Sequence, residues 1–122
     1  MIKKRKIGIL ALLCLACQAC QPTIQYEQIS AQEAIEMMEE KNDYIILDVR
    51  TQEEYDTEHI PQAILFDADN IEKQLPDKDQ YIFVYCRSGN RSKKASQKLA
   101  ELGYTNIYEF GGIQNWPGPK ES

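Results

Sequence analysis

Apolar and polar positions follow two alternating spacings along the chain from residue 26 onward. Short apolar runs are typical of strands, and they cover residues 26–29, 44–49, 63–66, 81–85 and 106–110. Helical spacing or capping signals predict helices between these runs, over residues 31–40, 51–57, 71–75 and 91–102. The run at 81–85 is continuous and aromatic, which makes it the strongest predicted strand.

Polar residues at the predicted helix ends support these boundaries. Ser30 with Glu33, and Thr51 with Glu54, each have the spacing of a capping box, in which two side chains bond the first backbone N–H groups of a helix. Gly103 follows the last predicted helix, as glycine often does at helix C-termini.

The order of the elements predicts the fold class. Strands that alternate with helices predict an α/β fold in three layers, with helices on both faces of a mainly parallel sheet of about five strands. Such sheets bind ligands at the carboxyl ends of their strands. Cys86 stands there, just after the strongest strand and before a helix. Gly111-Gly112 predicts a turn after the last strand, ahead of Trp116.

The first twenty residues have a different pattern. Four basic residues at 3–6 precede an apolar run at 7–16, which is typical of a secretory signal and too short to span a membrane. Small residues precede Cys17 and Cys20, and this resembles a bacterial lipobox, in which the cysteine after the cut receives a lipid. Either cysteine fits. We therefore expect a lipoprotein signal and lipidation region at 1–20, a tether at 21–25, and one domain at 26–122.

These assignments place the domain outside the cytoplasm. We expect it to be exported and anchored by lipid to the outer face of a bacterial membrane, at the cell surface or in the periplasm. The formal net charge is -5, and without the basic signal it falls to about -9, with ten Lys and Arg against nineteen Asp and Glu. So acidic a domain is not expected to bind nucleic acid. Cys86 is the only cysteine after residue 20, so the domain can form no internal disulfide.

The segment from Cys86 to Ser92 joins the strongest strand to a helix. A tight loop at a helix N-terminus turns backbone N–H groups toward one point and forms an anion cradle. The helix dipole and the side chains of Arg87 and Arg91 add positive charge. Gly89 permits backbone angles that other residues resist. Together these features favour a Cys86 thiolate, and hence a nucleophile beside a small oxyanion site.

This segment and three others resemble the rhodanese family. Its active loop follows the pattern Cys-Arg-x-Gly-x-Arg-Ser/Thr, which residues 86–92 match. The other resemblances are Leu47-Asp48-Val49-Arg50 with Glu54-Tyr55 after it, His59-Ile60-Pro61-Gln62-Ala63, and Gly111-Gly112 with Trp116. The resemblance covers residues 26–116 and implies a rhodanese-like fold.

The resemblance also implies an activity. Cys86 takes sulfur from a small-molecule donor such as thiosulfate, holds it as a persulfide, and passes it to a thiophilic acceptor such as cyanide or a thiol. No metal and no organic cofactor is implied. Catalysis is assigned to Cys86, and substrate binding to the loop residues Arg87, Ser88, Gly89, Asn90, Arg91 and Ser92.

Three further residues near the loop are interpreted as structural. Asp48 and Arg50 are expected to hold the loop framework together, and His59 belongs to a segment that resembles a structural turn. Transfer that starts from a thiolate needs no general base, so His59 is assigned no chemical step. Glu58 and Gln62 stand where the family often has glycine, and we expect a modified backbone there.

Two other functions fit the same loop. Phosphatases and arsenate reductases also hold a cysteine thiolate in an anion cradle. Their loops place five residues between cysteine and arginine, whereas only four separate Cys86 from Arg91. The smaller cradle favours sulfur over a phosphate ester. A carrier that holds sulfur without turnover is the non-enzymatic alternative.

Overall fold

The computed structural model describes residues 25–70, 75 and 77–122. The predicted signal and lipidation region, with Cys17 and Cys20, lies outside the described residues, as does the tether before Gln25. The helix expected at 71–75 also lies outside them, apart from Leu75. Within the described ranges, no helix is both long and apolar enough to cross a bilayer.

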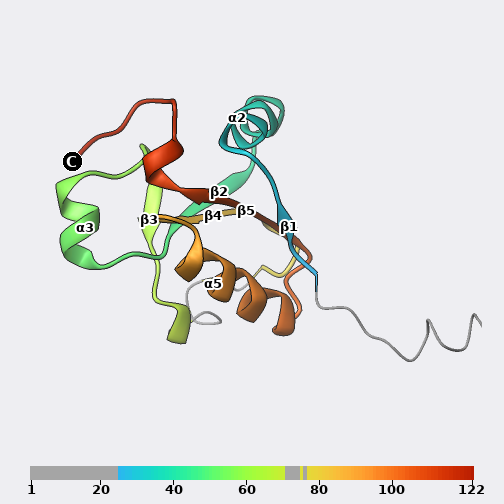
Figure 1. Cartoon of the computed structure of the whole chain (residues 1–122). Coiled ribbons are helices and arrows are strands. Elements are labelled where there is room, and N and C mark those ends of the chain that lie inside the picture. Colours follow the sequence, from blue (N-terminus) through green and yellow to red (C-terminus); the bar gives the residue numbers. More distant parts are fainter. Residues whose placement is uncertain (1–24, 71–74, 76) are drawn as a thin grey trace, which may run out of the picture.

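A five-stranded parallel sheet forms the centre of the molecule, in the order β1-β5-β4-β2-β3 (Figure 1). Its strands are β1 Glu27–Gln28, β2 Tyr44–Asp48, β3 Ala63–Leu65, β4 Tyr81–Cys86 and β5 Asn106–Gly112. The strongest predicted strand, β4, lies in the middle between β5 and β2. The prediction of an α/β fold with a parallel sheet of about five strands is therefore confirmed.

Helices cover both faces of this sheet (Figure 1). Helix α2, Ala31–Glu40, lies on one face, and α5, Asn90–Glu101, lies on the other. The third helix, α3, is Gln52–Thr57, and short 3-10 turns occupy η1, Ala68–Asn70, and η2, Ile113–Asn115. Both predicted capping boxes are present, at the starts of α2 and α3.

The buried apolar side chains form two clusters, one on each side of the sheet. The first packs the sheet against α5 and contains Leu47, Phe66, Leu75, Ile82, Val84, Ala95, Leu99, Tyr104 and Ile107. The second packs it against α2 and contains Ala34, Ile46, Ile60, Ala63, Phe83, Tyr85, Phe110, Ile113 and Trp116. Strand β4 contributes to both, because alternate side chains of a strand point to opposite faces.

The ends of β4 and β5 differ from the prediction. Strand β4 continues through Cys86, which pairs with Gly112 of β5. The prediction of a turn at Gly111-Gly112 is wrong, because both glycines belong to β5. A Cβ atom on Gly112 would lie only 1.9 Å from the Arg87 carbonyl oxygen. Glycine therefore lets β5 continue right beside the loop that follows β4.

The backbone at Gln62 has an unusual conformation. Gln62 stands where the family often has glycine, and it adopts a φ of 75°, in the left-handed region that glycine favours. A residue with a side chain is strained in this region. Glu58 has an extended φ of -169°, which any residue adopts.

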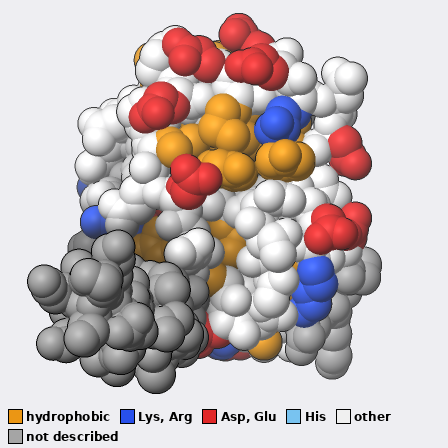
Figure 2. Space-filling view, turned by 90° about the vertical axis from the view of Figure 1, so that its right-hand side faces the viewer, with side chains coloured by type: hydrophobic (Ala, Val, Ile, Leu, Met, Phe, Trp, Pro, Cys, Tyr) orange, Lys and Arg blue, Asp and Glu red, His pale blue; other side chains and the backbone are white. Residues whose placement is uncertain are grey.

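The surface reflects the acidic composition. Figure 2 shows one face on which hydrophobic side chains gather beside a basic side chain, with acidic side chains around them.

At the amino ends of two neighbouring strands, Tyr81 and Tyr108 stack with ring centroids 6.1 Å apart, and the Lys41 ammonium lies 4.1 Å from the Tyr81 ring. At an exposed site, a contact such as that of the Lys41 ammonium with the Tyr81 ring contributes about 0.5–1 kcal/mol.

Candidate active site

The Cys86 sulfur lies at the C-terminal end of the central strand, beneath the loop that leads into α5. The backbone N–H of Gly89 donates to Cys86 Sγ at 3.0 Å, and Ser92 Oγ lies 3.4 Å from the same sulfur. Cys86 is 1% exposed, and Ser92 is fully buried. The sulfur therefore sits at the bottom of the loop, below the surface of the molecule.

Local backbone geometry explains why the loop turns toward this sulfur. Gly89 has a φ of 112° and precedes the first residue of α5, so the helix begins at Asn90, one residue before the predicted start. A residue with a Cβ atom would be strained in that conformation. The left-handed turn brings the first N–H groups of α5, with the positive end of its dipole, onto the end of β4.

The hydrogen bonds to the sulfur favour its anionic form. Burial raises the pKa of the Cys86 thiol, but it is outweighed by a hydrogen bond with the Ser92 hydroxyl and by hydrogen bonds with the backbone of Ser92, Gly89 and Ser88. The net result is a pKa below the ordinary thiol value. Three of the six loop residues at 87–92 therefore act on the sulfur through their backbone N–H groups.

The remaining loop residues lie at the surface. The side chains of Arg87, Ser88 and Asn90 are exposed. Arg91 is exposed as well, and its guanidinium forms two hydrogen bonds with the Glu54 carboxylate, at 2.7 and 3.0 Å. Arg91 therefore pairs with α3, and its positive charge also acts on Cys86, since the negative sulfur helps to raise the pKa of Arg91.

Asp48 and Arg50, which we interpret as framework residues, form a buried ion pair beside the loop. The Asp48 carboxylate accepts hydrogen bonds from Arg50 Nε and Nη2, and from the Tyr85 hydroxyl at 2.5 Å. Arg50 Nη2 also donates to the carbonyl oxygen of Glu58 at 2.6 Å. This network ties the ends of β2 and β4 to the segment after α3.

His59 is held by α3 and by the C-terminal segment. Its Nδ1 lies 2.8 Å from the carbonyl oxygen of Tyr55, and its ring stacks on the Tyr55 ring at 3.8 Å. Its backbone pairs with that of Glu121, whose carboxylate lies 3.5 Å from His59 Nε2. These contacts fit the structural role that we assigned to His59.

Two residues of the site were not predicted from the sequence. Tyr85 lies within a predicted strand, and its hydroxyl donates to Asp48 and also accepts the N–H of Ile60. Glu109 is 2% exposed, and its carboxylate lies 2.5 Å from Ser92 Oγ. A signal for Glu109 exists in the sequence, because an acidic residue interrupts the apolar strand at a position that shares a face with Ile107.

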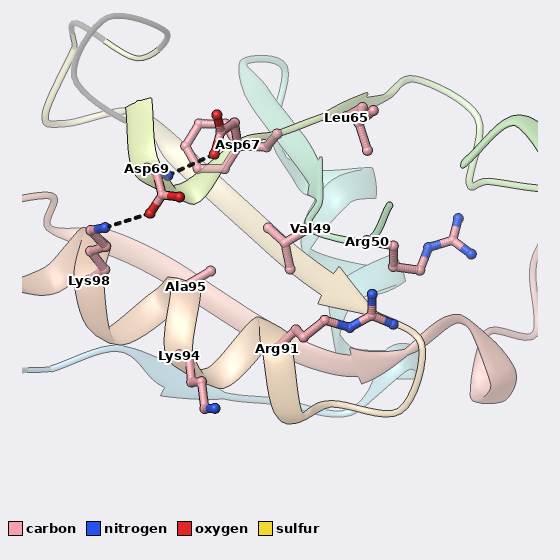
Figure 3. Close-up of a pocket in the computed structure, with 10 residues that line it drawn as sticks. Val49, Arg50, Leu65, Asp67, Asp69, Arg91, Lys94, Ala95 and Lys98 are labelled. Carbon is pink, nitrogen blue, oxygen red and sulfur yellow. Dashed lines mark hydrogen bonds and ion pairs between the residues drawn. The ribbon is translucent and has the colours of Figure 1, made fainter. Parts of the chain in front are cut away.

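An open cavity of about 700 Å³ lies between α5 and the segment after β3 (Figure 3). Arg50 and Arg91 stand at one end of this cavity, and Asp69 pairs with Lys98 at the other. Figure 3 shows Arg91 extending from the first turn of α5 toward Arg50. A second cavity of about 540 Å³ is also lined by Arg50, together with Arg87.

Comparisons with known proteins agree with this geometry. A model of the rhodanese-like domain matches residues 30–118. The chain is 35% identical over 96 residues to the thiosulfate sulfurtransferase GlpE of Coxiella burnetii. The match covers 76% of this chain and 89% of GlpE. It is similar to a solved E. coli structure described as a rhodanese with anions, with a TM-score of 0.60 and 34% identity over 65% of this chain and 98% of that one.

A longer relative matches as well. The adenylyltransferase and sulfurtransferase UBA4 of Candida albicans is 35% identical over 106 residues, which cover 78% of this chain. The chain spans only 24% of UBA4. The similarity therefore concerns one domain of that protein.

Proposed function

The chain belongs to the rhodanese-like domain family, and on this premise we propose that it is a sulfurtransferase that carries sulfur on Cys86. The donor in this proposal is a small sulfane compound such as thiosulfate, and the acceptor is thiophilic, such as cyanide or a thiol. The relatives named thiosulfate sulfurtransferase, at 35% identity, support this choice of donor.

The convergence of N–H groups on the Cys86 sulfur is the observation that carries the proposal. The Gly89 N–H donates to the sulfur, and the pKa of Cys86 is held below the ordinary value. The same N–H groups can donate to a persulfide anion, because its outer sulfur is bonded directly to the Cys86 sulfur. Because Cys86 is 1% exposed, we expect small donors and acceptors to react faster than bulky ones.

Sulfur transfer proceeds in two displacements at Cys86. In the first, the thiolate attacks the outer sulfur of thiosulfate, the new S–S bond forms, the S–S bond of thiosulfate breaks, and sulfite leaves with the electron pair. In the second, cyanide attacks the outer sulfur of the persulfide, thiocyanate forms, and the Cys86 thiolate leaves. Charge and electrons balance in both steps without an added oxidant or reductant.

Steady-state turnover of thiosulfate and cyanide tests the proposal. We expect the wild type to form thiocyanate and Cys86→Ser to form none above background, with an unchanged circular dichroism spectrum. Lys93→Ala, an exposed change on the outer face of α5, is the matched control and is expected to turn over normally. A fully active Cys86→Ser protein, or an inactive wild type, would reject the proposal.

A carrier without turnover is a second function that the burial of Cys86 favours, since a covered persulfide is shielded from acceptors. Mass spectrometry separates the two functions. A carrier treated with thiosulfate keeps one extra sulfur atom on the Cys86 peptide after cyanide is added. A sulfurtransferase loses that sulfur to cyanide and releases thiocyanate.

We also propose that the domain is exported and held at the outer face of a bacterial membrane by a lipid on Cys17 or Cys20. The basic and apolar pattern of residues 1–20 supports this location. Expression in bacteria with a labelled fatty acid tests it. We expect the label on the wild type and its loss in only one of the variants Cys17→Ala and Cys20→Ala. An unlabelled wild type, or label retained in both variants, contradicts the proposal.

A further inference from the structure

A buried carboxylate stands directly behind the candidate nucleophile. Glu109 lies on β5, and one of its oxygens, Oε2, accepts the N–H of Gly111 at 2.9 Å and lies 2.5 Å from Ser92 Oγ. Ser92 Oγ in turn lies 3.4 Å from Cys86 Sγ. All three side chains are at least 98% buried. The described residues therefore contain a continuous line of polar atoms from the sulfur to the carboxylate.

The Ser92 hydroxyl has only one proton, and several acceptors compete for it. It lies within hydrogen-bond distance of the Glu109 carboxylate, of the Gly89 carbonyl oxygen at 3.0 Å and of the Gly111 carbonyl oxygen at 3.4 Å, as well as of the sulfur. An ionised Glu109 takes this proton, because charged acceptors form the stronger hydrogen bonds. Ser92 can then only accept a hydrogen bond from the Cys86 thiol. A protonated Glu109 reverses the direction of these hydrogen bonds. It donates to Ser92, and the Ser92 hydroxyl can then donate its own proton to the sulfur.

We propose that Cys86 and Glu109 share one proton through Ser92, so that Glu109 holds the proton while Cys86 is a thiolate. This inference deepens the proposed function and rests on it for the role of Cys86 as nucleophile. Glu109 is a positioning residue in this scheme, because it acts on the sulfur through Ser92 and contacts no substrate.

The proton transfer balances without any external group. The S–H bond of Cys86 breaks, its electron pair stays on the sulfur, and its proton bonds to Ser92 Oγ. The original Ser92 proton moves to Glu109 Oε2. The negative charge thereby moves from the carboxylate to the sulfur, and the net charge of the buried site does not change. Because two buried anions would repel each other, one shared charge is the favoured state.

Other charged groups lie on the elements around this line, and none of the substitutions that test the shared proton changes them. They are Arg91 on α5, Glu54 on α3, Arg87 in the loop, the Asp48–Arg50 pair at the end of β2, and Glu27 on β1. Arg91 acts on the sulfur most directly, and its ion pair with Glu54 is independent of Ser92. None of these groups hydrogen-bonds the Glu109 carboxylate in the described part of the chain.

Thiolate titration gives the first test. The ultraviolet absorbance of the wild type minus that of Cys86→Ser isolates the Cys86 thiolate from the other cysteines of the full chain. A shared proton predicts two steps for the wild type, because the pair loses its protons one after the other and the thiolate is partly formed in between. A single thiolate step in the wild type overturns the proposal. This holds even if the substitutions below move that step to another pH, because charge repulsion between Glu109 and Cys86 is then enough to explain the movement.

Substitution of Glu109 gives the second test. Glu109→Gln keeps the shape and resembles the protonated acid, since the amide can donate to Ser92 and accept from Gly111. We expect one thiolate step, completed at least about one pH unit below the upper step of the wild type. Glu101→Gln, the same change at the exposed end of α5, is expected to leave both steps in place. Two unmoved steps in Glu109→Gln overturn the proposal.

Substitution of the bridging hydroxyl gives the third test. Ser92→Ala removes the link and leaves Glu109 in place, so we expect the lower thiolate step to disappear and the upper step to remain. Ser96→Ala is the matched control, since Ser96 lies one turn along α5, is fully buried, and its hydroxyl has no hydrogen-bond partner within the described residues. We expect Ser96→Ala to titrate like the wild type. Equal effects of the two substitutions overturn the proposal.

A measurement on Glu109 itself does not depend on whether Glu109→Gln folds. Carbon-13 NMR of the Glu109 carboxyl is expected to show two steps in the wild type and one step in Cys86→Ser, because coupling between two sites is reciprocal. Identical Glu109 titrations in the two proteins overturn the proposal. None of these measurements uses a sulfur donor. Loss of coupling in a protein that forms thiocyanate therefore rejects only the shared proton, and coupling without turnover rejects only the proposed function.

Discussion

At the residue scale, single positions hold unfavourable states that their neighbours stabilise. Cys86 is buried yet has a lowered pKa, because the first N–H groups of α5 converge on its sulfur. Asp48 and Arg50 are buried charges that hydrogen-bond each other. Tyr85 donates to the same carboxylate, and its burial and this hydrogen bond raise its pKa well above the ordinary value. Each of these residues depends on hydrogen bonds with named neighbours.

The Asp48–Arg50 pair makes a prediction about stability. Asp48→Asn is expected to lower the free energy of unfolding by about 3 kcal/mol, because it leaves the Arg50 guanidinium buried without a counter-charge. Tyr85→Phe removes one hydrogen bond to the same carboxylate and is expected to cost about 1–2 kcal/mol. Urea unfolding at neutral pH measures both. Equal losses of unfolding free energy in Asp48→Asn and Tyr85→Phe would contradict the prediction that removing the charge costs more than removing one hydrogen bond.

The strained backbone at Gln62 makes a second prediction. Gln62→Gly is expected to raise the free energy of unfolding by about 0.5–1 kcal/mol, because relief of the left-handed strain exceeds the entropy that glycine loses on folding. The same denaturation experiment measures this gain. Gln52→Gly, placed in the regular helix α3, is the control and is expected to destabilise the protein.

At the element scale, the site depends on contacts between the ends of elements. The Glu54 side chain caps α3 through the N–H of Thr51 and also binds Arg91 on α5. Strand β5 passes so close to the loop after β4 that Gly112 has no room for a Cβ atom. Helices α3 and α5 and strand β5 therefore fix the loop from three sides.

The Glu54–Arg91 contact predicts a dependence of stability on pH. The hydrogen bonds from Arg91, and next from the Thr51 backbone, lower the pKa of Glu54 from 4.5 to about 2. A lowered carboxyl pKa stabilises the fold above the unfolded value, and this contribution disappears as the pH falls from about 4.5 to about 2. Because the pair is partly exposed, we expect Glu54→Gln to cost only about 0.5–1 kcal/mol at pH 7.

Unfolding at several pH values checks this expectation. The difference between the wild type and Glu54→Gln is expected to shrink toward zero as the pH falls to about 2, and to shrink with added salt at pH 7. Glu53→Gln, the neighbouring substitution, controls for the general change in charge. A difference that stays constant with pH would show that the carboxylate charge is not the cause.

At the scale of the whole molecule, two apolar clusters share one sheet. Strand β4 contributes side chains to both clusters, so both clusters pack on the same strand and each helps to hold it in place. Trp116 belongs to the cluster beneath α2 and packs on Phe110 with ring centroids 5.3 Å apart. The C-terminal segment is held to the body of the domain by the backbone pairing of Glu121 with His59.

This sharing predicts one cooperative unfolding transition. Trp116 is the only tryptophan, so its fluorescence reports on the cluster beneath α2. We expect its urea transition to coincide with the loss of far-ultraviolet circular dichroism, as in two-state domains of this size. A fluorescence transition at lower urea would mean that the C-terminal segment and its cluster unfold separately.

Some features of the fold and of the site were predictable from the sequence, and others were not. The capping boxes, the parallel direction of the strands and the place of Cys86 at a strand end were predictable, because each follows from short patterns along the chain. The exact ends of β4 and β5 were not, because Gly112 continues the strand only where another strand lies beside it. The left-handed φ of Gln62 was not predictable either, because glutamine by itself disfavours that region.

The sequence by itself determined the periodic pattern, the single cysteine of the domain and the glycine-containing loop that turns N–H groups toward it, because these follow from residue type and short spacing. Only the tertiary structure decided that Arg91 binds Glu54, that Tyr85 joins Asp48, and that Glu109 stands behind Ser92. Each of these pairs joins residues at least 17 positions apart. The register of the sheet and the position of α5 bring them together, and no local pattern specifies either one.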